Sequence, residues 1–210
     1  MKENLSKVIS DILTALYRPL WFALLCSSIF MFVYKQNANM KTALKQWLMW
    51  FKNEKKFRRV FFLAFYTVIV LFRTLFDRTL FDNPLSNVLG EWGFYEEVNG
   101  QIVFNANVPE NFIMLVPFIF LLFFAFKDKI LKYNVSFLTI LWKSSVISFL
   151  FSLTIENLQL LLHLGTWQLS DLVYNTLGGV FGGVVYYITY IIAQKRRRKK
   201  KNAFRGGDNR

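Results

Sequence analysis

The chain has 210 residues, of which 54% are apolar and 19% aromatic, and its formal net charge is +13. A soluble domain of this length cannot bury so much apolar surface in one core, so a soluble globular protein is excluded. The positive charge lies between apolar runs, which indicates anionic lipid headgroups as its counterpart and argues against nucleic acid. The single cysteine, Cys26, excludes a disulfide framework.

Five apolar runs predict membrane helices, because a crossing needs about 20 apolar residues. They cover positions 17–34, 57–76, 111–126, 136–164 and 171–193. No small-residue cleavage site follows the first run, so we expect a retained helix there and no cleaved signal peptide. The expected fold class is an all-α integral membrane protein, a bundle of about five transmembrane helices.

The distribution of Lys and Arg predicts how these runs are oriented, because cytoplasmic segments of membrane proteins are rich in both. The segment 35–59 carries eight basic residues and one acidic residue, whereas 77–110 carries one basic residue and six acidic ones. Positions 195–201 are all basic. We therefore expect an outer N-terminus, an outer loop at 77–110 and a cytoplasmic C-terminus. The basic residues before the first run oppose this orientation; if that run is re-entrant or interfacial, the other four keep theirs.

The segment 40–57 places Trp47, Trp50 and Phe51 among five lysines. This pattern predicts an amphipathic helix in the headgroup layer. A docking site for an acidic partner is the alternative. The basic tail at 194–210 is interpreted as a positive-inside anchor, with a nucleic-acid or targeting role as its alternative.

The outer loop contains Asn99-Gly100 between the strand-prone segments 91–98 and 101–104. Asn-Gly between such segments favours a type I′ turn, because both central residues of that turn need positive φ. The sequence therefore predicts a small extracellular β-hairpin. Two roles remain open for it, a lid or a simple cap.

Ionisable residues inside membrane helices are costly, so each one is a candidate functional residue. Glu156, Gln159 and His163 share one face of the fourth run, because they are spaced by three and four residues. At 1.5 Å per residue, counting from Lys143 places Glu156 in the outer half of the membrane. His163, near the helix end, is interpreted as an interfacial residue.

Three other runs bring polar residues to the same depth. Arg73 lies at the outer end of the second run, Asn111 opens the third, and Asp171 and Asn175 lie one turn apart in the fifth. In one hypothesis Arg73 and Glu156 form a buried ion pair that only fixes helix register, with interhelical hydrogen bonds from nearby carboxamides. In the other hypothesis these residues line a polar pocket open to the outer leaflet.

The sequence lacks the motifs of several other kinds of site. It has no His and Cys spacing typical of metal ligands, no Gly-rich phosphate loop after a strand and no Ser–His pair at a useful spacing. Neither a metal nor a cofactor is therefore expected. The glycines at 178, 179, 182 and 183 form two overlapping Gly-xxx-Gly pairs, which predict close packing of the fifth run against the fourth.

Three segments carry a resemblance to a known family: Ser-Leu-Thr-Ile-Glu-Asn-Leu-Gln at 152–159, Gly-Thr at 165–166 and Asp-Leu-Val-Tyr-Asn-Thr-Leu-Gly at 171–178. The Glu-x-x-Gln helix, the short turn and the Asp-x-x-x-Asn-x-x-Gly helix resemble the signature of the VanZ-like membrane proteins. Arg73 and Pro117-Phe118 also resemble family positions. The resemblance covers about 57–190, whereas Thr166 and Trp167 stand where many members have Arg.

The apolar runs, the charges and the resemblance together predict a division of the chain into three parts. Residues 1–56 would form an N-terminal transmembrane helix and a basic amphipathic cytoplasmic segment. Residues 57–193 would form a VanZ-like four-helix membrane core with its outer loop at 77–110. Residues 194–210 would form a basic cytoplasmic tail.

The resemblance also implies a multi-pass protein of the bacterial cytoplasmic membrane that confers or modulates resistance to lipoglycopeptide antibiotics such as teicoplanin. The first hypothesis is a non-catalytic factor whose outer-leaflet pocket binds a lipid headgroup, a lipid-linked wall precursor or the antibiotic. The second is an intramembrane enzyme with Glu156 as general base and Asp171 as a second acid. A transporter is disfavoured, because no internal repeat is found. The candidate binding residues are Arg73, Asn111, Glu156, Gln159, Asp171 and Asn175.

Overall fold

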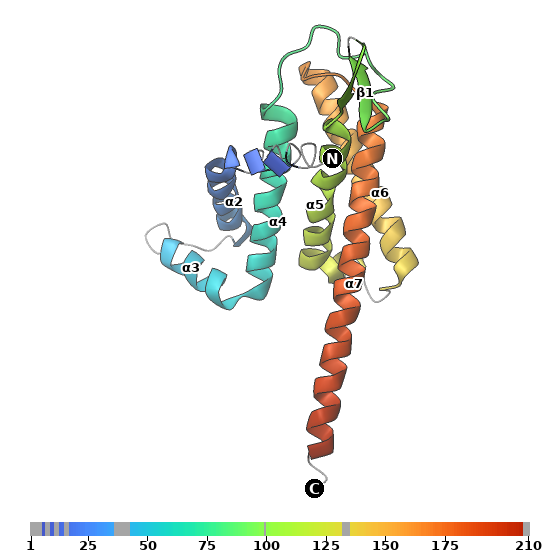
Figure 1. The fold of residues 1–210 in the computed structure, drawn as a ribbon. Coiled ribbons are helices and arrows are strands. Elements are labelled where there is room, and N and C mark those ends of the chain that lie inside the picture. The colour runs from blue at the N-terminus through green and yellow to red at the C-terminus, as the bar shows by residue number, and fades with distance from the viewer. Residues whose placement is uncertain are drawn as a thin grey trace.

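A computed structural model describes residues 6, 9–10, 13–14, 17–35, 43–98, 100–131 and 135–207, with only the backbone at 43, 98 and 200–207. The helices are α2 (Leu20–Lys35), α3 (Ala43–Asn53), α4 (Lys55–Leu71), the π-helical turn η1 (Phe72–Phe76), α5 (Asn107–Ile130), α6 (Phe137–Leu162) and α7 (Leu169–Gly207). Two strands, β1 (Tyr95–Val98) and β2 (Gln101–Phe104), complete the fold, which Figure 1 shows.

Four helices within the described residues are long and apolar enough to cross a membrane. They are Lys55–Phe76, Asn107–Ile130, Phe137–Leu162 and Leu169–Lys199. The first predicted run forms α2, which has 16 residues and is shorter than the about 20 that a perpendicular crossing needs. The all-α membrane fold with a small hairpin is therefore confirmed, with four full-length spans and one shorter apolar helix.

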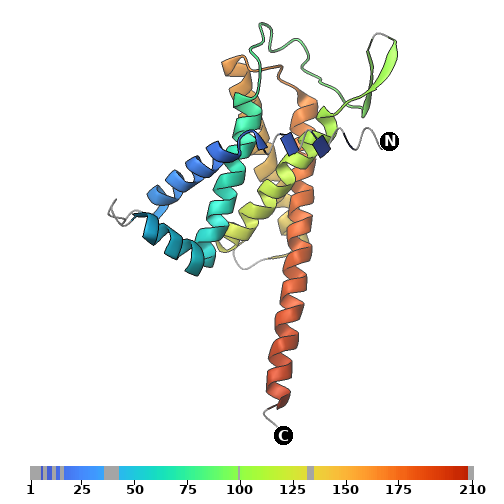
Figure 2. The same cartoon turned by 60° about the vertical axis from the view of Figure 1, so that its left-hand side comes forward.

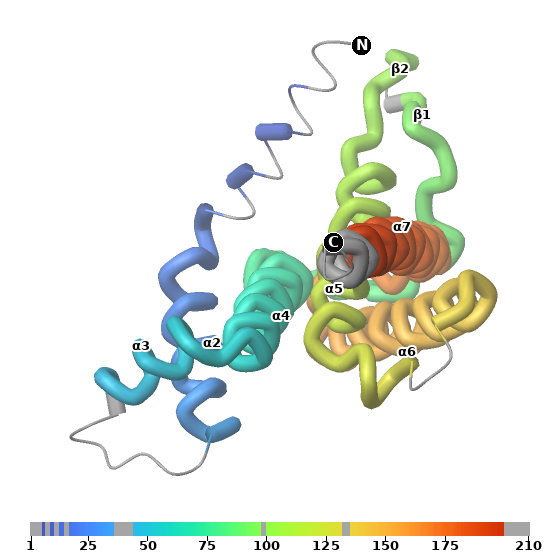
Figure 3. The backbone as a smooth tube through the Cα atoms, turned by 90° about the horizontal axis from the view of Figure 1, so that it is seen from below, coloured from blue at the N-terminus to red at the C-terminus, as the bar shows by residue number. Residues whose placement is uncertain are grey.

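The helices form two groups that meet at α4 and α5. Helices α5, α6 and α7 pack side by side, and α4 carries α2 and α3 on its far side, as the view along the bundle shows (Figure 3). The larger core cluster includes Leu115, Ile119, Phe123 and Ile140, all fully buried. A smaller cluster around Met31 joins α2, α3 and α4. The larger cluster is thus centred on α5, with further members from α4, α6 and α7.

Two glycines of α7 allow its close approach to α5. A Cβ added at Gly178 would stand 1.8 Å from the carbonyl oxygen of Phe112, and one at Gly182 would stand 2.3 Å from that of Val116. Only glycine fits such backbone-to-backbone contact. This contact with α5 was not predicted, because a Gly-xxx-Gly pair does not reveal which helix it faces.

The other two glycines face α6, as the sequence predicted. A Cβ at Gly179 would stand 2.2 Å from Ser148 Oγ, and one at Gly183 would stand 2.8 Å from the side chain of Ser144. Small residues on both helices therefore let their backbones come together. Helix α7 therefore packs closely against both α5 and α6.

The predicted hairpin is confirmed. Strands β1 and β2 pair antiparallel, with Tyr95 opposite Phe104 and Val98 opposite Gln101. Gly100 has φ of +76°, the conformation that the turn requires. Asn99 lies outside the described residues, and the first strand begins at Tyr95, four residues after the predicted segment opens. The hairpin projects from the end of the bundle (Figure 2).

The predicted amphipathic helix forms over the range of α3. Trp47 and Phe51 stack with ring centroids 5.1 Å apart, and Trp47 also meets the ring of Phe61 edge-on at 5.5 Å. Its aromatic face therefore packs on α4. The chain bends at Glu54, so the last two lysines of the predicted segment belong to α4, and residues 40–42 lie outside the described part. A position in the headgroup layer stays a prediction.

Ion pairs fix α2 antiparallel to α4. Arg18 contacts Asp77 at 3.2 Å at one end, and Lys35 contacts Glu54 at 2.7 Å at the other. The hairpin and the basic end of α7 lie at opposite ends of the bundle (Figure 1). This arrangement agrees with the predicted alternation of the runs, while the side of the membrane that each end faces stays a prediction.

Candidate functional site

A stripe of buried polar residues runs along α6. Ser144, Ser148 and Ser152 have no exposed surface, and Glu156 and Gln159 are 2% and 3% exposed. Their spacing of four, four, four and three residues places them on one helix face. Buried polar groups need hydrogen-bond partners, so the partners of this stripe define the candidate site.

Gln159 connects α6 to the end of α4. Its side-chain nitrogen donates to the carbonyl oxygen of Thr74 at 2.8 Å, and the bond is buried. Thr74 lies in η1, where a wider turn replaces the α-helical one. Such turns shift backbone groups out of the regular ladder. The interhelical hydrogen bond expected of Gln159 is therefore present, with a backbone carbonyl as its partner, whereas its role in binding stays a prediction.

Asn175 connects α7 to α6. Its side-chain nitrogen donates to Ser152 Oγ at 3.0 Å. The residue is 2% exposed, and its side-chain oxygen has no hydrogen-bond partner among the described residues. An unpaired buried acceptor costs about 1–3 kcal/mol. A hydrogen-bond donor from a ligand or a water molecule would satisfy this oxygen.

Two carboxyl groups lie close together beyond Asn175. Glu156 accepts a hydrogen bond from the backbone N–H of Gln168 at 3.1 Å. Asp171 interacts electrostatically with Glu156, and Ser170 Oγ lies 3.5 Å from its Oδ1. The side chain of Asn111 lies beside the Asp171 carboxyl group. Helices α5, α6 and α7 thus each contribute to one group of polar side chains.

Arg78 places a positive charge opposite these carboxyl groups. It interacts electrostatically with both Glu156 and Asp171, and its Nη1 atom lies 3.8 Å from where a Cβ of Gly165 would stand. The guanidinium therefore lies beside the α6–α7 turn, next to the positions of Thr166 and Trp167 that carry Arg in many family members. From the sequence, Arg78 was counted only as a charge. It is the one basic residue of the acidic loop 77–110, and this feature could have identified it as a candidate site residue.

We name these groups the hairpin-end cluster: Arg78, Asn111, Glu156, Gln168, Ser170, Asp171 and Asn175. A second layer borders it at the start of the hairpin. The backbone N–H of Glu91 donates to Ser170 Oγ at 3.1 Å, and the Glu91 carboxylate accepts from the side chain of Asn105. Asn105 is 2% exposed. This border adds a third carboxyl group, so three carboxyl groups lie around the single guanidinium of Arg78.

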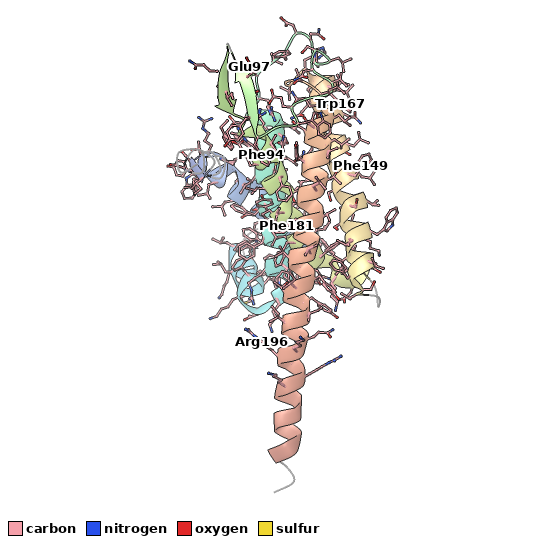
Figure 4. The ribbon with its side chains drawn as sticks, turned by 45° about the vertical axis from the view of Figure 1, so that its right-hand side comes forward. Phe94, Glu97, Phe149, Trp167, Phe181 and Arg196 are labelled. Atoms are coloured by element: carbon pink, nitrogen blue, oxygen red, sulfur yellow. The ribbon has the colours of Figure 1, made fainter. Side chains whose placement is uncertain are left out.

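A segment that we call the strap, residues 80–92, lies along the α6–α7 turn. Four backbone hydrogen bonds of 2.8–3.3 Å tie it down: Phe81 to His163, Trp167 to Pro84, Leu169 to Val88 and Ser170 to Leu89. The Tyr174 hydroxyl donates to the Trp92 carbonyl at 2.7 Å. Trp167 marks this end of the molecule in Figure 4, far from Arg196 at the basic end. The strap therefore covers the turn that holds Gln168 and Ser170.

The predicted ion pair between Arg73 and Glu156 is wrong. Arg73 contacts Asp77 and Glu110, each at 3.0 Å, and Asp77 also contacts Arg18. The π-helical turn directs Thr74 toward α6 and Arg73 toward the start of α5, so the two side chains serve different neighbours. Sequence spacing gave the depth of Arg73 correctly but could not give its direction.

His163 ends α6, as expected from its position. It has φ of +55° and is exposed, because the helix stops there in a left-handed cap. It therefore does not continue the buried face of Glu156 and Gln159.

Of the six predicted site residues, Asn111, Glu156, Asp171 and Asn175 meet in the hairpin-end cluster. Gln159 lies about one turn further along α6 and bonds to η1, and Arg73 belongs to a separate ionic group.

In the part of the chain that the structure describes, no group of three or more His, Cys, Asp or Glu side chains could hold a metal ion. The three carboxyl groups around the cluster are those of Glu91, Glu156 and Asp171. Their neighbours are the charge of Arg78, carboxamide side chains, the Ser170 hydroxyl and the backbone N–H of Gln168. The chemistry of the site is therefore that of a hydrogen-bonding and charge-pairing site.

The fold and the cluster define a multi-helix membrane protein with a buried polar group at one end. A family model described as VanZ/LLP1 matches residues 20–191, which is most of the chain, and this protein belongs to that family. The match begins with α2, so it extends beyond the range 57–190 of the sequence resemblance. No curated protein and no solved structure matches the chain. Membership supports a membrane protein linked in general terms to glycopeptide resistance.

Proposed function

We propose that this protein lowers sensitivity to lipoglycopeptide antibiotics such as teicoplanin by binding a ligand at the hairpin-end cluster. The ligand would be a lipid headgroup, a lipid-linked wall precursor or the drug itself. One observation carries the proposal: polar side chains from α5, α6 and α7 gather at one end of the bundle, where Asn111, Glu156, Ser170 and Asn175 are buried and the exposed Arg78 lies beside them. The Lys and Arg distribution predicts the outer leaflet for this end, where all three ligands are found.

The donors and acceptors of the cluster suggest the chemistry of its ligand. Glu156, Asp171 and the unpaired oxygen of Asn175 are acceptors, which suit hydroxyl or ammonium groups. Arg78 offers a planar fork of donors, which suits a phosphate or carboxylate. A ligand with both kinds of group, such as a phosphorylated sugar or a zwitterionic headgroup, fits this combination better than a purely apolar tail.

Movement of the strap would open access to the most deeply buried side chains of the cluster. Glu156 and Asn175 are each 2% exposed. The strap is held to the α6–α7 turn mainly by backbone hydrogen bonds, and its Leu85 and Leu89 side chains are exposed. Such a segment can open at lower cost than a helix of the core. We therefore favour the lid role over a simple cap for the loop.

A catalytic role is the second candidate, and the pairing of Glu156 with Asp171 is what favours it. One oxygen of Glu156 accepts from Gln168, which leaves the other for a substrate proton. A general base must reach the proton that it removes. The two roles differ in outcome, because an enzyme would consume a lipid-linked substrate whereas a binding factor would leave it unchanged.

The test measures drug susceptibility, normalised to protein level in the membrane fraction, for Asn175→Ala, Asp171→Asn and Arg78→Gln. An interhelical hydrogen bond in a membrane contributes about 0.6 kcal/mol on average and rarely more than about 1.7. Protein levels should therefore stay near normal while resistance is lost. Thr176→Val is the matched control, because Thr176 bonds only within its own helix, to Leu172.

Two results would contradict the proposal. Resistance that falls in proportion to protein level would mean that the cluster only stabilises the fold. Full resistance at normal protein level would mean that the cluster is not the site. A tail-less glycopeptide tested in parallel separates recognition of the acyl-tailed drug from a general effect on wall precursors. Turnover of a lipid-linked precursor by the purified protein would favour the enzyme.

A further inference from the structure

A cavity of about 420 Å³ lies at the basic end of the bundle, between α4, α5 and α7. It is at the opposite end from the hairpin-end cluster and shares no residue with it. The charged residues that line it are Arg59, Lys127, Asp128 and Arg197. Its aromatic lining comes from Phe120, Phe124, Tyr186 and Tyr190.

The cations of this cavity are held in place by aromatic rings. The Arg59 guanidinium lies 4.2 Å from the ring centroid of Phe124, and Lys127 Nζ lies 4.6 Å from that of Tyr190. Among the described residues, the ion pairs of the chain involve other cations. The three cations of the cavity are therefore available to pair with an anionic ligand. The lining carries one carboxylate, Asp128, against three cations, so it is net positive.

The lining changes from polar to aromatic along the membrane normal. On α7, Tyr186 lies roughly 16 Å along the axis from Arg197, at 1.5 Å per residue. The arginine is at the exposed end of the helix, and the tyrosine is 4% exposed in the core. Phe120 lies deeper than Lys127 on α5 in the same way. One end of the cavity therefore suits an anion and the other suits hydrocarbon.

We propose that this cavity binds an anionic phospholipid of the leaflet at the basic end, which the positive-inside rule makes the cytoplasmic leaflet. The headgroup phosphate lies among Arg59, Lys127 and Arg197, which match its oxygens with charged donors. The first part of an acyl chain lies along Phe120 and Tyr186. Basic recesses between helices at this depth are suited to anionic headgroups, because each Lys or Arg near the surface attracts such lipids.

The experiment uses the full chain purified in a neutral detergent and measures the binding of phosphatidylglycerol and phosphatidylcholine by native mass spectrometry. Arg59→Gln and Arg197→Gln should each weaken phosphatidylglycerol binding by about fivefold, the effect of one lost cation near a membrane surface. Phosphatidylcholine binding should stay weak in all variants. Size-exclusion chromatography checks that each variant is folded. If Arg59→Gln does not fold, the result for Arg197→Gln, at the exposed end of α7, decides whether the proposal holds.

Two further variants separate the cavity from diffuse attraction. Arg196→Gln removes the same charge from the neighbouring position, which lies outside the cavity lining, and should leave the binding nearly unchanged (Figure 4). Ala193→Phe fills part of the cavity without changing charge and should weaken the binding. Equal losses for Arg196→Gln and Arg197→Gln would overturn the proposal. Equal binding of phosphatidylcholine would also overturn it, as would full competition by free glycerol phosphate.

Discussion

At the scale of single residues, Arg73 shows how two helices share one guanidinium. Its two contacts at 3.0 Å reach Asp77 on its own segment and Glu110 at the start of α5. The Arg73 side chain is 39% exposed and the Glu110 side chain is 17% exposed. Partial solvation limits the energy of such a pair, so the group holds the ends of two helices in register without being a strong source of stability.

We expect Arg73 to be coupled to Glu110 and not to Glu156. In a double-mutant cycle with Arg73→Gln and Glu110→Gln, the coupling free energy should be about 1 kcal/mol or less, but measurable. The cycle with Arg73→Gln and Glu156→Gln should be additive within about 0.5 kcal/mol. Unfolding free energies in mixed micelles supply both values. A larger coupling to Glu156 would show that the contact geometry at η1 is incorrect.

At the scale of elements, the glycines of α7 set its distance from both neighbours. Replacing glycine by alanine in a helix gains up to about 1 kcal/mol from helix propensity. A Cβ at Gly178 would stand 1.8 Å from a backbone carbonyl oxygen, whereas at Gly183 the nearest atoms, Cβ and Oγ of Ser144, would be 1.0 Å further away, at 2.8 Å. The clash with backbone is the one that cannot be relieved locally.

Gly178→Ala should therefore destabilise the protein by about 1–3 kcal/mol, the usual cost of overpacking, because the clash outweighs the gain in helix propensity. Gly183→Ala should cost clearly less and serves as the matched control. Thermal unfolding in detergent and the amount of protein in the membrane fraction report both effects. Equal behaviour of the two variants would contradict the different packing of α7 on α5 and on α6.

The strap is the second element whose role can be tested. Leu80 and Leu164 form an isolated antiparallel bridge between the strap and the α6–α7 turn. Such opposed positions bring two Cβ atoms close enough for a disulfide. A Leu80→Cys, Leu164→Cys double variant in a Cys26→Ser background should lose resistance when oxidised and regain it on reduction, because a locked strap keeps a ligand out.

The control for this cross-link is Tyr95→Cys with Phe104→Cys, whose positions are opposite each other in the hairpin. It places a disulfide in the same loop without tying the strap to the helices, so resistance should persist in both redox states. Resistance that survives oxidation of the Leu80–Leu164 cross-link would show that the strap is a fixed cap.

At the scale of the whole molecule, the charge distribution predicts its orientation. The hairpin and the basic end of α7 lie at opposite ends of the bundle. In a Cys26→Ser background, Glu97→Cys at the hairpin should react with a membrane-impermeant maleimide added to intact cells. Lys199→Cys should react only after the cells are opened. The reverse pattern would place the hairpin-end cluster in the inner leaflet and remove the basis of the proposed function.

The sequence alone determined the helices, because long apolar runs without water must satisfy their backbone hydrogen bonds internally. It also determined the hairpin, because Asn-Gly demands a specific turn. The depth of Glu156, Asp171 and Asn175 followed from helical rise, since distance along one helix is a local property. These features needed no knowledge of how the helices pack.

Only the tertiary structure decided which polar groups meet. Helical rise fixes depth but not the rotation of one helix relative to another, so the predicted partner of Arg73 was wrong although its level was right. Arg78 was missed because the loop that carries it has no periodicity from which a position can be calculated. The cavity around Arg59 and Arg197 likewise arises from residues nearly 140 positions apart. Contacts of this kind depend on packing between elements, which no local pattern encodes.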